Sequence, residues 1–334
     1  VSGSSTPGTG TPIAQALTAT ATTAGTVVYE VTPTSPAGCV GTKKTATITV
    51  NPRPTITPVV NASAICSGSS TSIGLQSDIA GATYTWTVAV TGGLTGASNG
   101  SGSNIVQTLN TNGTTTGTAE YTITATTSNP ANCTNSAVTK VLITVYPIPT
   151  ISIGATSATI CNGGSTQLTA TVAPAGGTFL WTPGNSTANP ITVSPTSTTS
   201  YNCQYTVNGC SNSTSRNITV NQLPANVAIT PNPASATICS GKSITLTASS
   251  SDNGGSYLWA PGGQTTPAIT VSPGANQTYT VTYTLPTTCA QTATQAVTVN
   301  TTPTVTVTPA PVGAICNGAS VTLSANPSAG GGCQ

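Results

Sequence analysis

The sequence has almost no charged residues and no histidine. Four of its 334 residues are acidic and six are basic, so charged residues make up 3% of the chain and the net charge is +2. Ordinary globular proteins are about a quarter charged. So little charge provides neither the basic surface that binds nucleic acid nor an acidic surface that attracts cations. We therefore expect no nucleic-acid partner.

The residue types that build most catalytic sites are missing or scattered. Without histidine the chain cannot form a Ser-His-Asp or Cys-His nucleophile system. The four acids are far apart in the sequence: Glu30, Asp78, Glu120 and Asp252. This distribution gives no carboxylate pair for glycoside hydrolysis and no acidic cluster for calcium. We predict that the chain is not an enzyme and has no catalytic residues.

Long apolar runs and metal-binding cysteine pairs are absent as well. No segment approaches the 18 apolar residues that a membrane helix needs, so we expect no membrane insertion. None of the ten cysteines forms a CxxC pair, which argues against zinc, iron–sulfur clusters and other cofactors. Regularly spaced cysteines without metal-site spacing indicate disulfides and hence an oxidising compartment. We expect an extracellular or cell-surface location.

What the sequence does contain is an internal repeat, marked by two series of cysteines. Four copies of an Ile-Cys-[Ser/Asn]-Gly motif carry Cys66, Cys161, Cys239 and Cys316, at spacings of 95, 78 and 77. A second series lies in loop-like segments and carries Cys39, Cys133, Cys210 and Cys289, at spacings of 94, 77 and 79. The two series alternate in step, which indicates tandem repeats with one longer copy.

Each repeat contains the same succession of short alternating segments. The segment "SITLTAS" places Ile244, Leu246 and Ala248 on one face, and "TYTVTYTL" does the same for Tyr279 and Val281. Such short β-branched runs, bounded by Gly, Pro, Asn or Ser, predict strands. About seven strands per repeat predict an all-β fold: a tandem array of Ig-like β-sandwiches.

Short proline-containing segments separate the repeats. Proline restricts its own φ and the preceding residue, so these linkers should be stiff. We expect five segments: 1–50 as the C-terminal part of a domain, 51–145 as a longer domain, 146–220 and 221–300 as two domains, and 301–334 as the N-terminal part of a further domain. We expect the parent array to be longer than this sequence.

The order of these motifs resembles a known class of repeats. The pattern runs from "ATICSG" and "SITLTAS" through "YLW", "PAITVSP" and "TYTVTYT" to the loop cysteine and "AVTVN". It is similar to the Ig-like and PKD-like repeats of very large Bacteroidota surface proteins, which resemble gliding-motility-associated adhesins exported by type IX secretion. The resemblance covers the whole chain and implies an extracellular adhesin region.

The cysteine series permits two pairing schemes. One bridge per repeat would pair Cys66 with Cys133, Cys161 with Cys210, and Cys239 with Cys289. Alternatively, each Ile-Cys cysteine pairs with the loop cysteine of the following repeat, which a strict Ig topology favours because the first turn and the last hairpin lie at opposite ends. We prefer the intradomain scheme, since the first strand is irregular and could cross the sandwich. Cys203 and Cys333 lie outside both series, and we expect Cys203 to be a buried free thiol.

The aromatic residues and one insertion raise the question of sugar binding. Trp86, Trp181 and Trp259 recur at the same strand position, which indicates core packing rather than stacking on a sugar. The insertion "TGGLTGASNGSGSN" at residues 91–104 could bind polysaccharide or could simply be a packing loop.

Our leading hypothesis is a disulfide-braced extracellular stalk or filament that supports adhesion or gliding. Its partners would be other copies or neighbouring repeats of the same long chain, since so little charge opposes side-by-side contact. The alternatives are an array of polysaccharide-binding modules and the spacer region of a secreted enzyme.

Overall fold

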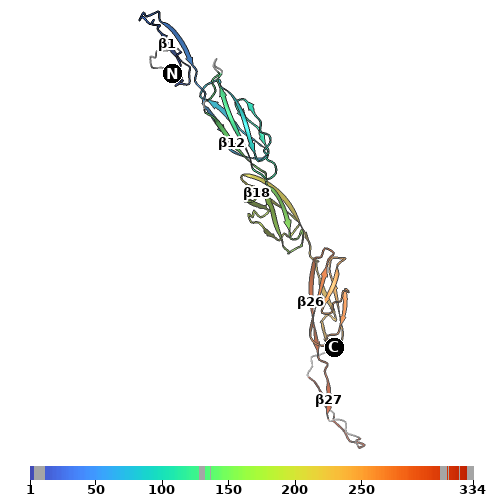
Figure 1. Ribbon diagram of the computed structural model, residues 1–334. Helices are drawn as coiled ribbons and strands as arrows, with labels where there is room; N and C mark the ends of the chain where they lie inside the picture. The colour runs from blue at the N-terminus through green and yellow to red at the C-terminus, as the bar shows by residue number, and fades with distance from the viewer. Residues whose placement is uncertain are drawn as a thin grey trace. The chain divides into compact units, whose positions relative to one another are not determined.

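The computed structural model describes residues 1–3, 12–127, 132–135, 137–308, 314, 316–322 and 324–328, and everything below refers to these residues. The described chain contains strands and no helix (Figure 1). It accordingly contains no helix with the length and apolar character of a membrane span. The fold is the all-β tandem array of Ig-like sandwiches that the alternating segments predict.

The strands fall into five groups along the chain. The first group is the hairpin β1 (Gly25–Val31) and β2 (Lys44–Val50). The second comprises β3 (Ile56–Val60), β4 (Ala64–Cys66), β5 (Ser69–Ser70), β6 (Ile73–Ser77), β7 (Thr83–Thr91), β8 (Gly100–Ser101), β9 (Asn104–Ile105), β10 (Thr108–Leu109), β11 (Gly117–Thr126) and β12 (Thr139–Tyr146). The third comprises β13 (Thr150–Ala155), β14 (Thr159–Cys161), β15 (Thr166–Ala173), β16 (Thr178–Thr182), β17 (Ile191–Val193), β18 (Thr199–Val207) and β19 (Cys210–Asn221).

The fourth group comprises β20 (Ala228–Asn232), β21 (Thr237–Cys239), β22 (Ile244–Ser249), β23 (Ser256–Ala260), β24 (Ala268–Val271), β25 (Gln277–Thr284) and β26 (Ala290–Asn300). The fifth is the pair β27 (Val305–Thr308) and β28 (Ser324–Pro327). The third and fourth groups thus repeat the same succession of strands.

Two sheets face each other in every complete group. The fourth group has a three-stranded sheet of order β20-β22-β24 and a four-stranded sheet of order β21-β26-β25-β23. The third group has the corresponding sheets β13-β15-β17 and β14-β19-β18-β16. The longer second group has β3-β6-β9 and the five-stranded β4-β12-β11-β7-β8, with a small sheet β10-β5 beside them.

Alternation along the strands builds the core of each sandwich. In β22, Ile244, Leu246 and Ala248 are buried while the threonines between them are more exposed, and in β25 the same holds for Tyr279 and Val281. Side chains alternate between the two faces of a strand, so each strand contributes every second residue to the core. In the fourth group these residues form one cluster around Trp259.

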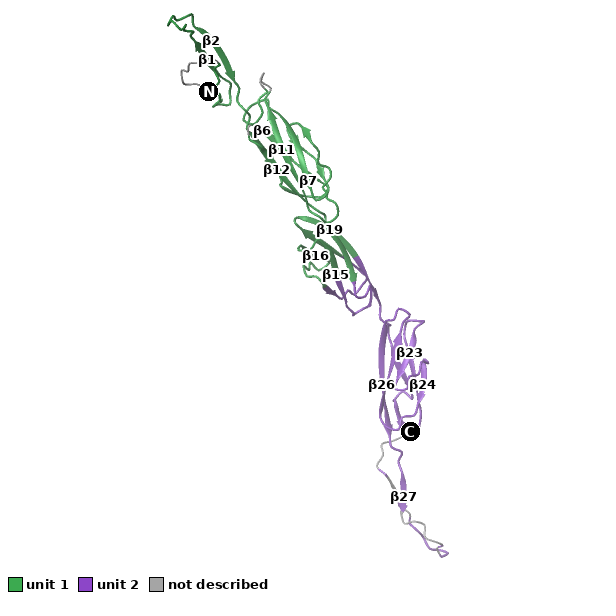
Figure 2. Cartoon of the chain, in the orientation of Figure 1, with its two compact units in different colours: residues 1–154, 169–190, 202–215 green, residues 155–168, 191–201, 216–334 purple. Residues whose placement is uncertain are grey.

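The described chain divides into two compact units (Figure 2). The first consists of residues 1–154, 169–190 and 202–215, and the second of residues 155–168, 191–201 and 216–334. The strands of the third group are therefore shared between the units.

One short strand in each complete sandwich positions the cysteine of the Ile-Cys motif. The strands β4, β14 and β21 pair in parallel with β12, β19 and β26, the last strand of the same sandwich. We call these three short strands the A′ strands. Each ends at the cysteine of an Ile-Cys motif.

Candidate functional site

The A′ strand brings its cysteine to the end of the sandwich where the chain leaves. Cys66 lies opposite Tyr146, the last residue of β12, and Cys161 lies opposite Asn221, the last residue of β19. The residue after each cysteine fixes this position, because the Ser67 and Asn162 amides donate hydrogen bonds of 2.8 Å to the carbonyl oxygens of Tyr146 and Asn221. Cys239 and Ser240 repeat the arrangement at Asn300.

The loop cysteines lie at the opposite end of each sandwich, where the chain enters. The Sγ of Cys210 lies 4.0 Å from the carbonyl oxygen of Tyr146, and that of Cys289 lies 3.9 Å from the carbonyl oxygen of Asn221. Both loop cysteines are buried. The same backbone carbonyl therefore receives the A′ strand of one sandwich and the loop cysteine of the next.

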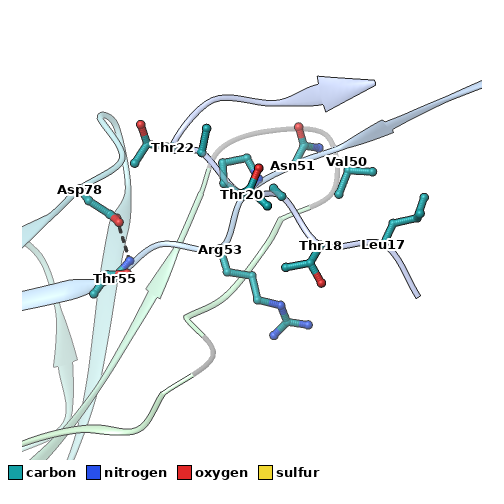
Figure 3. Close-up of a pocket in the computed structure, with 12 residues that line it drawn as sticks. Leu17, Thr18, Thr20, Thr22, Val50, Asn51, Arg53, Thr55 and Asp78 are labelled. Atoms are coloured by element: carbon teal, nitrogen blue, oxygen red, sulfur yellow. Dashed lines mark hydrogen bonds between the residues drawn. The ribbon is translucent and has the colours of Figure 1, made fainter. Parts of the chain in front are cut away.

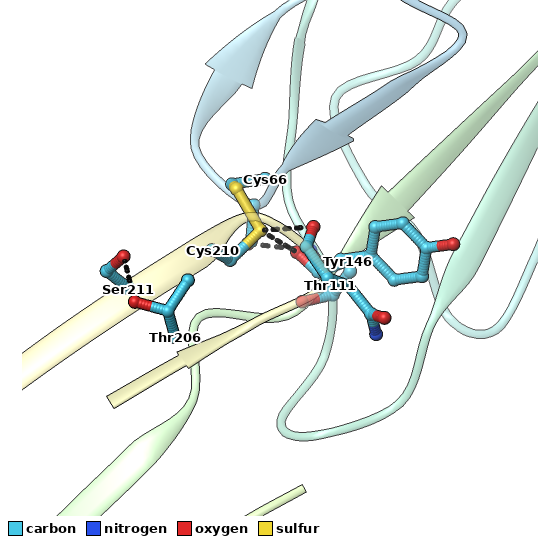
Figure 4. Close-up of a disulfide and its surroundings, with 8 residues drawn as sticks. Cys66, Thr111, Tyr146, Thr206, Cys210 and Ser211 are labelled. Atoms are coloured by element: carbon cyan, nitrogen blue, oxygen red, sulfur yellow. Dashed lines mark hydrogen bonds between the residues drawn. A yellow bond between two sulfur atoms is a disulfide. The ribbon is translucent and has the colours of Figure 1, made fainter. Parts of the chain in front are cut away.

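Two disulfides join these partners. Cys66 bonds Cys210 and Cys161 bonds Cys289, with Cα atoms 5.6 Å apart in both bridges (Figure 4). Figure 4 shows the first bridge lying against Tyr146. Each bridge is internal to one compact unit, Cys66–Cys210 to the first and Cys161–Cys289 to the second.

This pairing corrects the intradomain scheme that the sequence analysis preferred. Cys66–Cys133, Cys161–Cys210 and Cys239–Cys289 are not formed; the bridges follow the alternative scheme, from each Ile-Cys cysteine to the following loop cysteine. The physical reason is distance. Cys133 precedes β12 and Cys66 lies at its end, and a strand of that length spans roughly 25 Å. A disulfide requires Cα atoms within about 7 Å.

The remaining cysteines differ in their surroundings. Cys239 is also disulfide-bonded. Cys39 and Cys316 are exposed free thiols, and Cys133 is a half-buried one. Cys203 is buried and free, as expected, and burial raises the pKa of its thiol. Cys333 lies outside the described residues.

The three tryptophans lie in the sandwich cores. Trp86, Trp181 and Trp259 are buried. Each indole N–H donates to a loop carbonyl of its own sandwich: that of Ser98 at 3.1 Å, Ala188 at 2.9 Å and Thr266 at 2.9 Å, respectively. No indole face is therefore available for stacking on a sugar.

The insertion at residues 91–104 folds back onto its own sandwich. Leu94 is part of the core cluster, and Thr95 pairs with Asn110 in an isolated bridge. The Asn99 side chain accepts a hydrogen bond from the Val88 amide at 2.8 Å. These contacts are those of a packing loop.

The four acids have structural partners in the described chain. Glu30 pairs with Lys43 at 2.8 Å and Glu120 with Lys140 at 2.6 Å. Asp78 and Asp252 accept backbone N–H groups at the start of their sandwiches, from Thr55 at 2.8 Å and Ala225 at 2.6 Å. Among the described residues, no three histidine, cysteine or acidic side chains gather as metal ligands do.

The Asp78 contact borders a cavity of about 470 Å³ (Figure 3). Residues 17–22 and 50–53 supply most of its lining, including the Arg53 side chain. The hydrogen bond from the Thr55 amide lowers the pKa of Asp78, while partial desolvation opposes the shift. The Asp78 carboxylate is thus an anchor for the Thr55 backbone rather than a proton donor.

Two features of the bridges escaped the sequence reasoning. One is the parallel pairing of the A′ strand with the last strand, which sets the cysteine at the exit end. The other is the carbonyl that both cysteines approach. The sequence does mark the position of this carbonyl. A Thr-Val pair precedes every linker, and the next residue carries the carbonyl: Asn51, Tyr146, Asn221 and Asn300.

Comparison with known proteins supports the fold. Residues 1–54 and 63–149 match the family model of the PKD-like domain. No curated protein sequence matches the chain significantly.

Three solved structures are similar to this chain at low sequence identity and low TM-score. The I-band fragment I67–I69 of titin is 12% identical, with a TM-score of 0.35, covering 74% of this chain and 98% of that one. The D1–D4 ectodomain fragment of ICAM-5 is 11% identical, with a TM-score of 0.39, covering 83% of each chain. A structure from a 1.5-MDa bacterial ice-binding adhesin is 13% identical, with a TM-score of 0.31, covering 73% of this chain and 98% of that one.

Proposed function

We propose that this chain is a structural repeat region of an extracellular adhesin, a stalk whose consecutive domains are covalently stapled to one another. The observation that carries the proposal is the pair of bridges from an A′ cysteine to the next loop cysteine. Each bridge joins two consecutive sandwiches rather than two strands of one sandwich. The bridges thus prevent neighbouring domains from separating.

The position of the bridges suits a chain under tension. Each bridge sits beside the residue where one sandwich ends and the linker begins, Tyr146 or Asn221. A pull along the chain would load this linker first, and the disulfide provides a second covalent path around it. This geometry favours a load-carrying stalk over a string of independent binding modules.

The bridges also stabilise the folded state. The bonded cysteines are separated by 144 and 128 positions in the sequence. For loops of this length the chain-entropy model gives about 5 kcal/mol each. Disulfides of this kind form in exported proteins. Together with the resemblance to Bacteroidota surface arrays, they support an extracellular role in adhesion or gliding, with type IX secretion as the export route.

The experiment that tests this function measures cell attachment under flow. In the source cells, Cys210→Ser and Cys289→Ser would be introduced together, which removes both bridges. We expect attachment in still medium to persist and attachment at high shear to fall. Cys203→Val is the matched control, because Cys203 is a buried free thiol at a position where the next repeat has Val281.

Two results would contradict the stalk. Equal shear resistance in the double variant and the wild type would show that the bridges carry no load. Loss of attachment in still medium, with surface display unchanged, would instead indicate a direct binding role. A non-reducing peptide map of wild-type cells checks that both bridges are present before the comparison is made.

A further inference from the structure

The thiol of Cys203 is shielded inside the third sandwich, which strands β13–β19 form. Its side chain is 0% exposed, and among the free cysteines of the described chain it is the buried one. It lies opposite Trp181 where β18 pairs with β16, and burial raises the pKa of its thiol. A disulfide is attacked by a thiolate rather than by a thiol. The folded sandwich therefore keeps this nucleophile unreactive.

The fold also separates Cys203 from a disulfide that is close to it in the sequence. Cys210 lies seven positions further along the chain and is bonded to Cys66. The hydroxyls of Thr206 and Ser211, on the neighbouring strands β18 and β19, are 2.9 Å apart (Figure 4). This register places Cys210 opposite residue 207, four residues along β18 from Cys203, which is roughly 13 Å. A disulfide requires Cα atoms within about 7 Å, so the two cannot bond in the folded sandwich.

The covalent path through the bridges places Cys203 where a pull acts. With both bridges closed, a pull applied outside residues 66 and 289 passes through the backbone of residues 161–210. The bridges bypass residues 66–161 and 210–289, so the strands in those two stretches bear no load. Cys203 lies within the loaded stretch. Unfolding of the third sandwich therefore exposes Cys203 and removes the desolvation that raises the pKa of its thiol.

We propose that Cys203 is a built-in nucleophile that opens the Cys66–Cys210 bridge once the third sandwich has unfolded. Its thiolate attacks the Sγ of Cys210, the Cys203–Cys210 bond forms and the Cys66–Cys210 bond breaks. Cys66 leaves as a thiolate and takes up the proton that Cys203 lost. One disulfide replaces another, so the step consumes neither an oxidant nor a reductant. A flexible loop of about ten residues closes in roughly 10–100 ns, so the sulfur atoms meet often whenever the unfolded segment is relaxed.

The exchange transfers the load to the second sandwich, which strands β3–β12 form. Cys66 and Cys161 are 95 positions apart, whereas Cys161 and Cys210 are 49 positions apart. After the exchange, the path runs along the backbone from Cys66 to Cys161 and then across to Cys289, so it is longer by 46 residues. A pull favours this longer product. It opposes the alternative Cys66–Cys203 bond, which would shorten the path.

This inference goes beyond the stalk function, because it concerns the covalent chemistry of a single isolated chain. The exchange cuts no backbone bond and leaves the Cys161–Cys289 bridge in place. Loss of Cys203 should therefore leave cell attachment unchanged, and the two proposals can fail separately.

The test is single-molecule pulling of the purified chain without a reductant, with handles attached just outside residues 66 and 289. The chain is pulled until the third sandwich unfolds, then relaxed, then pulled again. On the second pull we expect the wild type to be longer by about 150 Å, at roughly 3.3–3.6 Å for each of the 46 added residues. Unfolding of the second sandwich should appear as a new event in the same trace.

Two variants separate the exchange from other sources of length. Cys203→Val should unfold in the first pull as the wild type does and gain no length in the second; the next repeat has a buried valine, Val281, at this position. Cys133→Ser is the matched control, because Cys133 is the other free thiol that the structure describes between the handles. It should keep the full gain.

An alkylating reagent identifies the reacting thiol. Added to the folded wild type and then washed out, it should leave the gain intact, because Cys203 is buried. Added while the third sandwich is held unfolded, it should abolish the gain. A wild-type path that keeps its length or shortens on the second pull would overturn the proposal, as would an equal gain in Cys203→Val.

Discussion

The Asp78 carboxylate shows how this chain uses a rare charged residue. It accepts the backbone N–H of Thr55 just before β3 begins, and Asp252 does the same for Ala225 before β20. The chain has only four acids. Two of them hold the backbone in place just before the first strand of a sandwich. The amide hydrogen bond favours the charged carboxylate and lowers the pKa of Asp78.

We predict that Asp78 makes the stability of its sandwich depend on pH in the acid range. A pKa that is lower in the folded state means that the stabilisation is complete above the unfolded value, 3.8, and is lost as the pH falls through the folded value. Urea unfolding between pH 6 and roughly pH 2 should show this loss. In Asp78→Asn, the same acid range should show a smaller dependence; an unchanged slope would contradict the assignment.

A tyrosine and a glycine fix the corner before the tryptophan strand. The Tyr283 hydroxyl donates to the Asp252 carbonyl at 2.8 Å and accepts the Gly255 amide at 3.0 Å. In the preceding sandwich, Tyr205 makes the same two bonds with Pro174 and Gly177. The glycine lies so close to the tyrosine ring that no side chain fits between them.

We predict that Gly255→Ala destabilises its sandwich by roughly 1–3 kcal/mol, the usual cost of overpacking. A Cβ at this position would lie 2.5 Å from Cζ of Tyr283 and 2.8 Å from the Thr284 carbonyl oxygen. Gly274→Ala is the control, because its Cβ would meet nothing within 4 Å and its backbone is unstrained. Chemical denaturation of the two variants should separate them; equal stabilities would refute the contact.

At the level of elements, most of the fold could be predicted from the sequence. Alternating apolar residues identify the strands, because a sandwich strand buries every second side chain. The pairing of the cysteines does not follow from this alternation. A strand as short as β4 has no periodicity to read, and its parallel pairing with β12 joins residues 64–66 to residues 144–146, far along the chain.

Across the whole molecule, the two bridges limit how far the chain can be stretched. When both disulfides are reduced, the whole backbone between residues 66 and 289 can be extended. With both bridges intact, the shortest covalent path runs from Cys66 across to Cys210, back along the chain to Cys161, and across to Cys289. Even complete unfolding of the sandwiches can extend only that shorter path.

We predict that reduction lengthens the fully unfolded segment by about 600 Å, at roughly 3.3–3.6 Å for each released residue. Single-molecule pulling, with handles attached just outside Cys66 and Cys289 and with or without a reducing agent, measures this difference directly. The Cys210→Ser and Cys289→Ser double variant should behave as the reduced chain does in both conditions. Equal contour lengths for the oxidised and reduced wild type would contradict the bridge assignment.

The bridges also overlap, since the loop closed by Cys66–Cys210 and the loop closed by Cys161–Cys289 share residues 161–210. One consequence concerns damage rather than force. A protease that cuts the backbone once, anywhere between residues 66 and 289, leaves both pieces attached through at least one disulfide. The region tolerates a nick at any linker or loop along this stretch, and only a second cut or a reductant can release a fragment from it.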